Sequence, residues 1–227
     1  MRYYALAIDG PAGAGKSSVA KMLAAKLKYT YIDTGAMYRA ITYKALELKI
    51  DISNPNEFDF IDKTIMEFKN DILYLDGEDV TFKIRSNDVS NNVSVVASHI
   101  PVRNKLVFLQ QKIALDRNVV MDGRDIGTVV LPNADLKIYM SASVEERARR
   151  RFEENVSLGI DTDYQKLIIE IKRRDKIDSS RSYNPLKQAN DAIFLDTSHL
   201  DIHEVANKIY EMFLNEIHTK RSDWDGY

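Results

Sequence analysis

A short apolar segment followed at once by a glycine-rich turn constrains the fold of this chain more than any other feature. Residues 3–9 read YYALAID and residues 10–18 read GPAGAGKSS. From Gly10 to Ser17 the turn fits the spacing G-x-x-x-x-G-K-[ST], in which glycines let several backbone N–H groups point toward one anion. The pattern therefore predicts a buried strand, a phosphate-binding loop, and a helix whose positive N-terminal end faces the phosphate.

The residues of this loop have separate chemical uses. Lys16 can reach the β- and γ-phosphate oxygens of a nucleoside triphosphate, and the Ser17 hydroxyl can ligate Mg²⁺. The alternative is a flexible glycine turn that binds nothing, but the strand before it and the amphipathic helix after it favour a binding loop. We expect the following loop residues to bind ATP: Gly10, Pro11, Ala12, Gly13, Ala14, Gly15, Lys16, Ser17 and Ser18.

The rest of the chain alternates between two hydrophobic patterns. Short apolar runs predict five strands, at 3–9, 29–33, 118–122, 136–140 and 192–196. Apolar stripes at helical spacing predict helices at 17–28 and 203–217. Because the runs scarcely alternate in polarity, we expect an α/β fold with a five-stranded parallel sheet flanked by helices. Residues 70–85 break this rhythm, and an Asp-Gly turn there predicts a small antiparallel insertion.

Composition narrows the class of protein further. The chain has 227 residues, 44% of them hydrophobic, which suffices for one large domain that spans residues 1–227. A formal net charge of −2 gives no global reason to expect binding to nucleic acid or to a membrane. With no cysteine, no long apolar run, no signal-peptide pattern and no coiled-coil pattern, the sequence predicts a monomeric cytoplasmic protein.

A phosphate-binding loop alone is shared by several classes of protein. A guanine-specific GTPase is expected to carry Asn-Lys-x-Asp, but neither of the two Asn-Lys pairs, at 104 and 207, is followed by that aspartate. A motor-type ATPase usually has a glutamate after the aspartate of its second strand, to activate water, whereas Gly123 follows Asp122 here. The sequence therefore indicates neither class.

Three further motifs follow the loop in order. DTGAMYR spans residues 33–39, DGRDIGTVV spans 122–130, and RDKIDSSR spans 174–181. Together with GPAGAGKSS, this set resembles the bacterial cytidylate kinases, a group within the nucleoside monophosphate kinase family. The resemblance runs from about residue 3 to about residue 200, and the tail HTKRSDWDGY has no counterpart in it.

The resemblance implies both a fold and an activity. The fold is a P-loop kinase core with a strand-containing NMP-binding insertion at about 37–105 and a helical lid at about 150–180. The activity is ATP-dependent phosphorylation of CMP and dCMP to CDP and dCDP with Mg²⁺, a step of pyrimidine nucleotide metabolism. Two alternatives stay open: another nucleoside monophosphate kinase, for UMP or dTMP, and a nucleotide-binding switch that catalyses nothing.

The resemblance also implies where the phosphate and the sugar of the acceptor bind. Arg39 and Arg124 would hold the acceptor phosphate, with Arg181 nearby, since forked guanidinium groups match phosphate oxygens. Arg174 and Asp178 would contact the sugar hydroxyl groups. The alternative for these two residues is an ion pair between positions i and i+4 of one helix.

Recognition of the base is implied in the same way. Arg103 and Asp125, helped by Ser94, would read cytosine, which presents two acceptors and one donor amine. Uracil would reverse both polarities and leave the reading groups unpaired. The alternative for Asp125 is an N-cap of the following helix. Thr34 completes the expected set of CMP-binding residues.

Arginines are concentrated in one part of the chain. Residues 147–181 hold seven of the fourteen arginines, and ERARRR places Arg147, Arg150 and Arg151 on one helical face. A charge-rich triphosphate would relieve the mutual repulsion of this face, and the alternative is an ordinary solvated helix surface. The expected catalytic residues are Lys16, Arg124, Arg147, Arg150 and Arg151.

The expected mechanism is direct in-line transfer of the γ-phosphoryl group from Mg·ATP to an oxygen of the acceptor phosphate. Because that acceptor is already ionised, the reaction needs no strong general base, and catalysis comes from positioning and charge cancellation. We expect Ser17, with Asp122 acting through water, to hold the metal.

Overall fold

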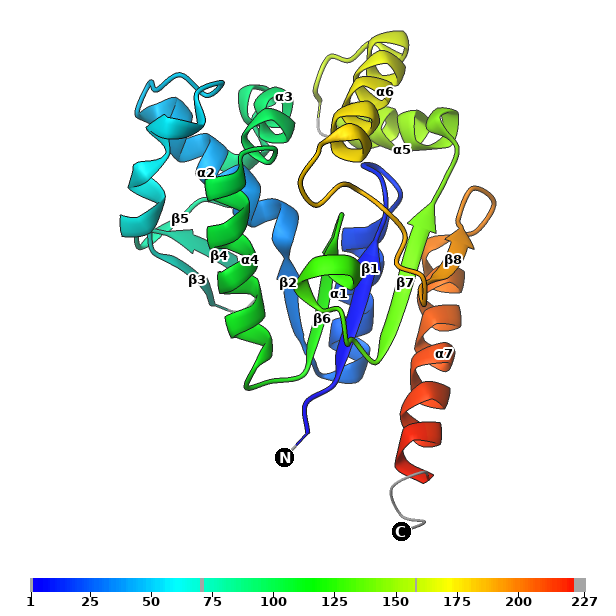
Figure 1. Cartoon of the computed structure of the whole chain (residues 1–227). Helices are drawn as coiled ribbons and strands as arrows, with labels where there is room; N and C mark the ends of the chain where they lie inside the picture. The colour runs from blue at the N-terminus through cyan, green and yellow to red at the C-terminus, as the bar shows by residue number, and fades with distance from the viewer. Residues whose placement is uncertain (1, 70–71, 158, 223–227) are drawn as a thin grey trace.

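A five-stranded parallel sheet forms the centre of the structure, a computed structural model that describes residues 2–69, 72–157 and 159–222. Its strands are β1 (Ala5–Asp9), β2 (Thr30–Asp33), β6 (Val119–Gly123), β7 (Leu136–Ser141) and β8 (Ile193–Asp196). They lie in the order β2-β6-β1-β7-β8, and each neighbouring pair is parallel (Figure 1). All five predicted strands are therefore confirmed, with ends that differ by at most two residues.

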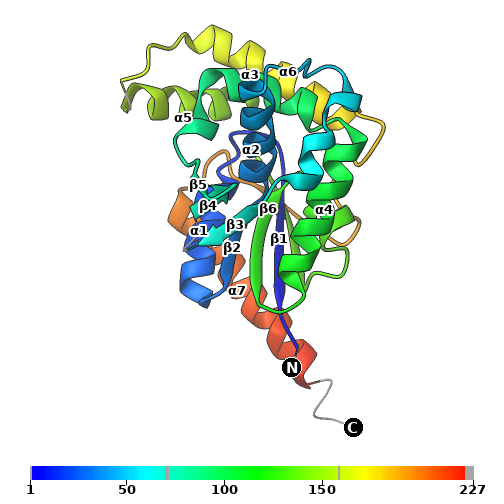
Figure 2. The same ribbon diagram turned by 90° about the vertical axis from the view of Figure 1, so that its left-hand side faces the viewer.

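Helices bury both faces of this sheet. The helices concerned are α1 (Lys16–Leu27) and α7 (Ile202–Ser222) on one face, and α2 (Thr34–Glu47) and α4 (Ile100–Ala114) on the other. Leu6 and Ile8 of β1 belong to the hydrophobic cluster that includes α1 and α7, whereas Ala7 between them belongs to the cluster that includes α2 and α4. Figure 2 shows α1 and α4 on opposite sides of the sheet. The apolar, scarcely alternating strands thus have the environment that their sequences predict.

The strand register brings three chain segments to one edge of the sheet. Asp33 of β2 lies beside Asp122 of β6, and Asp9 of β1 lies beside Gly123. The glycine-rich loop leaves the sheet directly after Asp9, α2 begins directly after Asp33, and the segment DGRDIGTVV begins in the last two residues of β6 and continues beyond the strand. Since open α/β sheets bind ligands at the carboxyl ends of their strands, the fold assembles the predicted motifs where a ligand site is expected.

A small antiparallel sheet interrupts the alternation of strands and helices. Its strands are β3 (Met66–Lys69), β4 (Ile72–Leu75) and β5 (Glu78–Asp79), in that order. The predicted Asp-Gly turn joins β4 to β5, and both of its residues have positive φ, 50° at Asp76 and 86° at Gly77. Residues 70 and 71 of the predicted segment lie outside the described residues.

Within 70–85, short strands were expected around the Asp-Gly turn, and the last of them, β5, ends at Asp79, before the predicted segment does. Residues Lys83–Arg85 form a 3₁₀ helix, η3, in which the Arg85 N–H donates to the Phe82 carbonyl and the Ser86 N–H donates to the Lys83 carbonyl. The insertion also contains two 3₁₀ helices, η1 (Pro55–Glu57) and η2 (Asp59–Lys63), and the helix α3 (Asn87–Val96). The boundaries 37–105 for an NMP-binding unit stay a prediction.

Two helices, which we call the crossing helices, pass over the carboxyl edge of the sheet. They are α5 (Val144–Ser157) and α6 (Tyr164–Ser180), and Figure 1 shows both at the top of the molecule, beyond the ends of β1 and β7. Ala148 of α5 packs against Leu167 and Ile171 of α6 in a small hydrophobic cluster of their own. The region expected to form a helical lid is helical, while its role as a mobile lid at 150–180 stays a prediction.

Candidate active site

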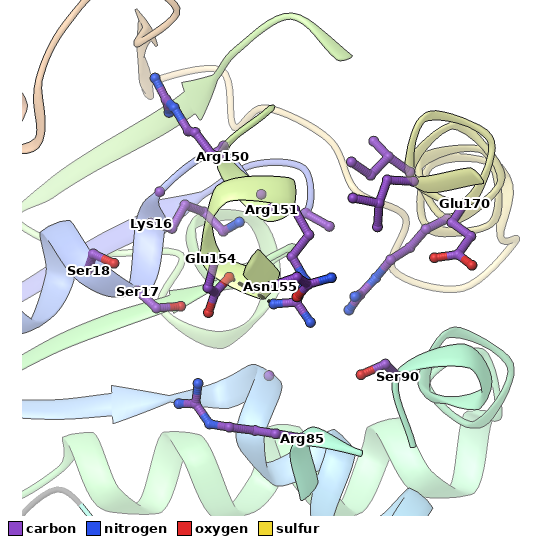
Figure 3. Close-up of a pocket in the computed structure, with 18 of the residues that line it drawn as sticks. Lys16, Ser17, Ser18, Arg85, Ser90, Arg150, Arg151, Glu154, Asn155 and Glu170 are labelled. Carbon is purple, nitrogen blue, oxygen red and sulfur yellow. Dashed lines mark hydrogen bonds and ion pairs between the residues drawn. The ribbon is translucent and has the colours of Figure 1, made fainter. Parts of the chain in front are cut away.

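A cleft of about 1380 Å³ opens at the carboxyl edge of the sheet. Its walls come from the glycine-rich loop, from α2 and α3, and from the crossing helices α5 and α6. Figure 3 shows Lys16 and Ser17 on one side of this cleft, with Arg85 and Ser90 on another. Segments that are far apart in the sequence thus share one cavity, which is large enough for two small molecules.

The backbone of the glycine-rich loop is shaped by glycines at both ends. Gly15 has φ of 84° and precedes α1, which starts without a side-chain cap, so the first N–H groups of the helix remain open to an anion. At Gly10 an added Cβ would lie 1.9 Å from the Met140 carbonyl oxygen. A side chain there would displace β7, the neighbouring strand of the sheet.

Lys16 is held inside the loop that it serves. Its side chain is 5% exposed, and its Nζ donates to the Pro11 carbonyl oxygen at 2.7 Å. Burial lowers the pKa of Lys16 well below its usual value, and the charge of Arg124 lowers the pKa further. A phosphate group placed against Lys16 would raise this pKa again, because its negative charge favours the protonated amine.

The two residues expected to hold the metal lie in contact. The Ser17 hydroxyl donates to Asp122 Oδ2 at 2.8 Å, and the Tyr31 hydroxyl donates to Asp122 Oδ1 at 2.8 Å. Burial raises the pKa of Asp122, and the nearby charge of Asp33 raises it further. Hydroxyl and carboxylate oxygens are ligands that suit Mg²⁺. Within the described ranges no group of three or more His, Cys, Asp or Glu side chains could hold a metal by itself, so phosphate oxygens and water would supply most ligands.

A cluster of arginines lines the same cleft as the loop. Arg39, Arg124 and Arg174 all line the cavity. Arg39 donates to the Ser90 hydroxyl at 2.8 Å, and Arg124 to Asp178 at 2.9 Å, whereas Nε of Arg174 is buried without a hydrogen-bond partner. Burial and the neighbouring guanidinium groups lower the pKa of Arg39 to about 10 and that of Arg174 to about 9. Crowded, partly unpaired cations of this kind indicate an anion-binding site.

The expected base-reading residues lie beneath the cleft surface. Arg103 is 1% exposed and forms a buried ion pair with Asp125, while it also donates to the Ala97 carbonyl at 3.0 Å. The ring of Tyr38 lies against the Arg103 guanidinium, 5.4 Å from ring centroid to Cζ. Of the expected base readers only Ser94 lines the cleft. Direct contact of Arg103 and Asp125 with a base therefore stays a prediction.

Two structural alternatives from the sequence are decided by these contacts. The Asp125 side chain makes no capping hydrogen bond to the turn η4 (Ile126–Val130), so the N-cap alternative is wrong. Asp178 pairs with Arg124 rather than with Arg174, so the i, i+4 pair is wrong as well. Both carboxylates instead make ion pairs with arginines of other segments.

The remaining residues expected to bind the acceptor nucleotide, Thr34 and Arg181, make hydrogen bonds within the protein. The Thr34 hydroxyl donates to the Asp122 carbonyl at 2.7 Å. Arg181 donates to the Asn184 carbonyl at 2.6 Å, and its Nη2 lies 3.8 Å from Asp125. Neither residue lines the cleft, and their contact with a nucleotide stays a prediction.

The three arginines of α5 that were expected on one helical face do not all line the cleft. Arg147 is buried and donates to the Ala12 carbonyl of the glycine-rich loop at 3.0 Å and to Asp175 of α6 at 2.7 Å. Arg150 and Arg151 line the cleft, where they pair with Glu146 and Glu154. Arg147 thus ties the two crossing helices to the loop, and a catalytic role for any of the three stays a prediction.

The structure adds lining residues that the sequence did not single out. At the loop end of the cleft these are Thr197, Leu200 and Val205, which follow β8. On the insertion side they include Arg85 and Ser90. The predicted end of the fifth strand at 196 was a signal for the first group, because loops after parallel strands line such clefts.

The fold and the site together define a P-loop phosphotransferase, with an anion-binding loop and a cluster of arginines (Arg39, Arg124 and Arg174) in one cleft. The model of the family described as cytidylate kinase matches residues 6–215, and the chain belongs to this family. It is 55% identical over 211 residues to a cytidylate kinase of Bacillus pumilus, across 91% of this chain and 94% of that protein.

Further comparisons agree with this assignment. A cytidylate kinase of Bacillus subtilis (strain 168) is 52% identical over 211 residues, across 91% of this chain and 94% of that protein. Among solved structures, an uncharacterized protein from Eubacterium ventriosum superposes with a TM-score of 0.53 and 13% identity, over 94% of this chain and 99% of that one. That likeness supports the fold alone.

Proposed function

We propose that this enzyme transfers the γ-phosphoryl group of ATP to CMP and dCMP, giving CDP and dCDP. The observation that carries the proposal is the cationic wall of Arg39, Arg124 and Arg174, which lines the same cleft as Lys16. An anion-binding loop and a crowded cationic cluster within one cleft suit two phosphate compounds whose phosphate groups meet there. Membership of the cytidylate kinase family supplies the identity of the acceptor.

The mechanism follows from where charge develops during transfer. The N–H groups at the start of α1 and the ammonium of Lys16 stabilise the donor phosphates. The arginine cluster holds the acceptor phosphate, whose oxygen is already ionised and attacks in line without a general base. Ser17, with Asp122 acting through water, would hold Mg²⁺, which would neutralise charge on the donor phosphates. The crossing helices would exclude water and so limit ATP hydrolysis.

Recognition of cytosine is the finer part of the proposal. Arg103 can donate to the acceptor atoms of the base, and Asp125 can accept from its exocyclic amine. Their ion pair fixes both groups beneath the cleft before the base arrives. Uracil would present an acceptor to the carboxylate and an N–H to the guanidinium, which favours CMP over UMP.

An acceptor panel tests the proposed reaction. ADP formation from Mg·ATP is measured with CMP, dCMP, UMP, AMP and dTMP, and without any acceptor. We expect turnover only with an acceptor, and the highest kcat/KM with CMP or dCMP. A higher value with UMP or AMP would overturn the base assignment, and turnover that ignores the acceptor would favour a nucleotide switch.

The lowered pKa of Lys16 predicts proton uptake when a nucleotide binds. In the empty cleft the pKa of Lys16 lies well below 10.5, and bound phosphate raises it, so the complex holds more protons than the free protein at pH 8. Titration calorimetry of ADP in buffers of different ionisation enthalpy should give uptake approaching one proton per site. The affinity for ADP should fall as pH rises. Lys16→Met should abolish the uptake; unchanged uptake in that variant would contradict the assignment.

We also propose that the enzyme works in the cytoplasm on free nucleotides, with Mg²⁺, as a monomer. Across the described part of the chain, no helix is both long enough and apolar enough to cross a membrane. The net charge of −2 gives no general attraction to nucleic acid. Size-exclusion chromatography with light scattering would test the monomeric state.

A further inference from the structure

Asp9, the last residue of β1, makes contacts that the proposed mechanism does not use. Its side chain is 4% exposed and lies directly before Gly10, the first residue of the glycine-rich loop. Its two carboxylate oxygens accept hydrogen bonds from the backbone N–H groups of Ile126 and Gly127, both at 2.7 Å. These bonds connect residues more than one hundred positions apart.

The two N–H groups open the turn that begins immediately after Asp125. The first N–H groups of any helical turn have no partner inside the turn and need an acceptor from elsewhere. In most helices the preceding residue supplies it, but the Asp125 carboxylate is paired with Arg103 instead. Asp9 therefore caps this turn from another strand and leaves the carboxylate of Asp125 free for its ion pair.

The approach of Asp9 to the turn depends on a residue without a side chain. An added Cβ at Gly127 would lie 3.3 Å from Asp9 Oδ2 and 3.1 Å from Cδ of Lys137. The Lys137 ammonium is already paired with Asp191 and the Pro132 carbonyl.

Burial raises the pKa of Asp9 to about 6, while the two backbone bonds oppose that rise. Its position thus costs solvation, which suits a residue kept for a specific role.

We infer that Asp9 is a positioning residue for recognition of the acceptor base. By holding the N–H groups that follow Asp125, it fixes the direction of the Asp125 carboxylate, and it does so from the root of the triphosphate loop. The inference rests on the proposed function, in which Asp125 and Arg103 read cytosine. A residue next to the triphosphate-binding loop thus contributes to selectivity for the base of the acceptor nucleotide.

The test is a double-mutant cycle on substrate selectivity. Asp9→Asn keeps the size of the side chain but offers only one good acceptor and turns an amide N–H toward a backbone donor. We expect the ratio of kcat/KM for CMP to that for UMP to fall roughly tenfold or more, mainly through the KM for CMP, because reading groups tolerate little displacement. Asp125→Asn should lower the same ratio, since its amide can donate to uracil.

The decisive outcome is the combined variant. If Asp9 acts through Asp125, Asp9→Asn lowers the ratio no further in the Asp125→Asn background. Equal loss with both substrates, or a second full decrease in the double variant, would overturn the inference while the proposed function stands. If Asp125→Asn leaves the ratio unchanged, the reading role of Asp125 fails and the inference fails with it, although CMP turnover itself still tests the proposed reaction separately.

A matched control separates positioning from stability. Asp135, which directly precedes β7, is a buried carboxylate that accepts from the N–H of Ala5, the first residue of β1, at 2.9 Å. Asp135→Asn should lower the unfolding midpoint without changing the CMP to UMP ratio. Should Asp9→Asn not fold, Gly127→Ala crowds the same contact while keeping the carboxylate, and we expect it to lower the ratio. An unchanged ratio in a folded Gly127→Ala enzyme would overturn the inference.

Discussion

Replacing Lys16 by alanine is expected to lower kcat by about 10²- to 10³-fold, the usual consequence of removing one donor aimed at developing charge. The ammonium is buried beside the Pro11 carbonyl, in the loop that would hold the triphosphate. We therefore expect the Lys16 side chain to stabilise bound phosphates more than it stabilises the fold. Burying an amine is itself costly, so the alanine variant should unfold at a denaturant concentration close to that of the parent.

Steady-state kinetics with ATP and CMP, together with urea denaturation, measure both effects. Lys26→Ala is the matched control, because Lys26 is an exposed lysine of the same helix that donates to Asn207 of α7. It should keep kcat within about twofold of the parent, since an exposed polar contact contributes little. Retained turnover in Lys16→Ala would contradict the assignment of the loop as the donor site.

Asp125→Ala is expected to lower the free energy of unfolding by about 3–5 kcal/mol, because it leaves the charge of Arg103 buried without its partner. Urea denaturation measures the loss. Asp116→Ala is the control: it breaks an exposed pair with Arg117 and should leave the urea midpoint close to that of the parent. Replacing Arg103 by methionine in the Asp125→Ala background should recover part of the loss.

The same pair connects stability with selectivity. If Asp125→Ala is no more destabilising than Asp116→Ala, the pair is not the rigid buried unit described above. Recognition of cytosine by Arg103 and Asp125 would then need another physical basis, since flexible groups discriminate poorly between a donor and an acceptor.

The central sheet and the glycine-rich loop were predictable because each follows from local sequence. An apolar run such as residues 118–122 can be satisfied only by burial on both faces, and the loop carries its own spacing. The Asp-Gly turn located the β4–β5 hairpin for the same reason. The 3₁₀ helix beyond that turn was not predicted, since the burial of Ile84 in the core depends on how the insertion packs.

The contacts inside the site were not predictable in this way. That Asp125 pairs with Arg103, and that Asp9 caps the turn after Asp125, depends on which strands are neighbours in the sheet. Local sequence made Asp125 a reasonable N-cap, and only the arrival of Asp9 from β1 removes that need. Arg147 was expected among the phosphate-binding arginines, and its bond to the Ala12 carbonyl depends on how α5 crosses the loop.

Binding of a bridged compound tests most directly whether donor and acceptor occupy one cleft end to end. In this compound adenosine and cytidine are joined through a polyphosphate chain. We expect one binding site by titration calorimetry, competition with both ATP and CMP, and weaker binding in both Lys16→Ala and Arg39→Ala. Competition with one nucleotide only, or affinity unaffected by Arg39→Ala, would contradict it.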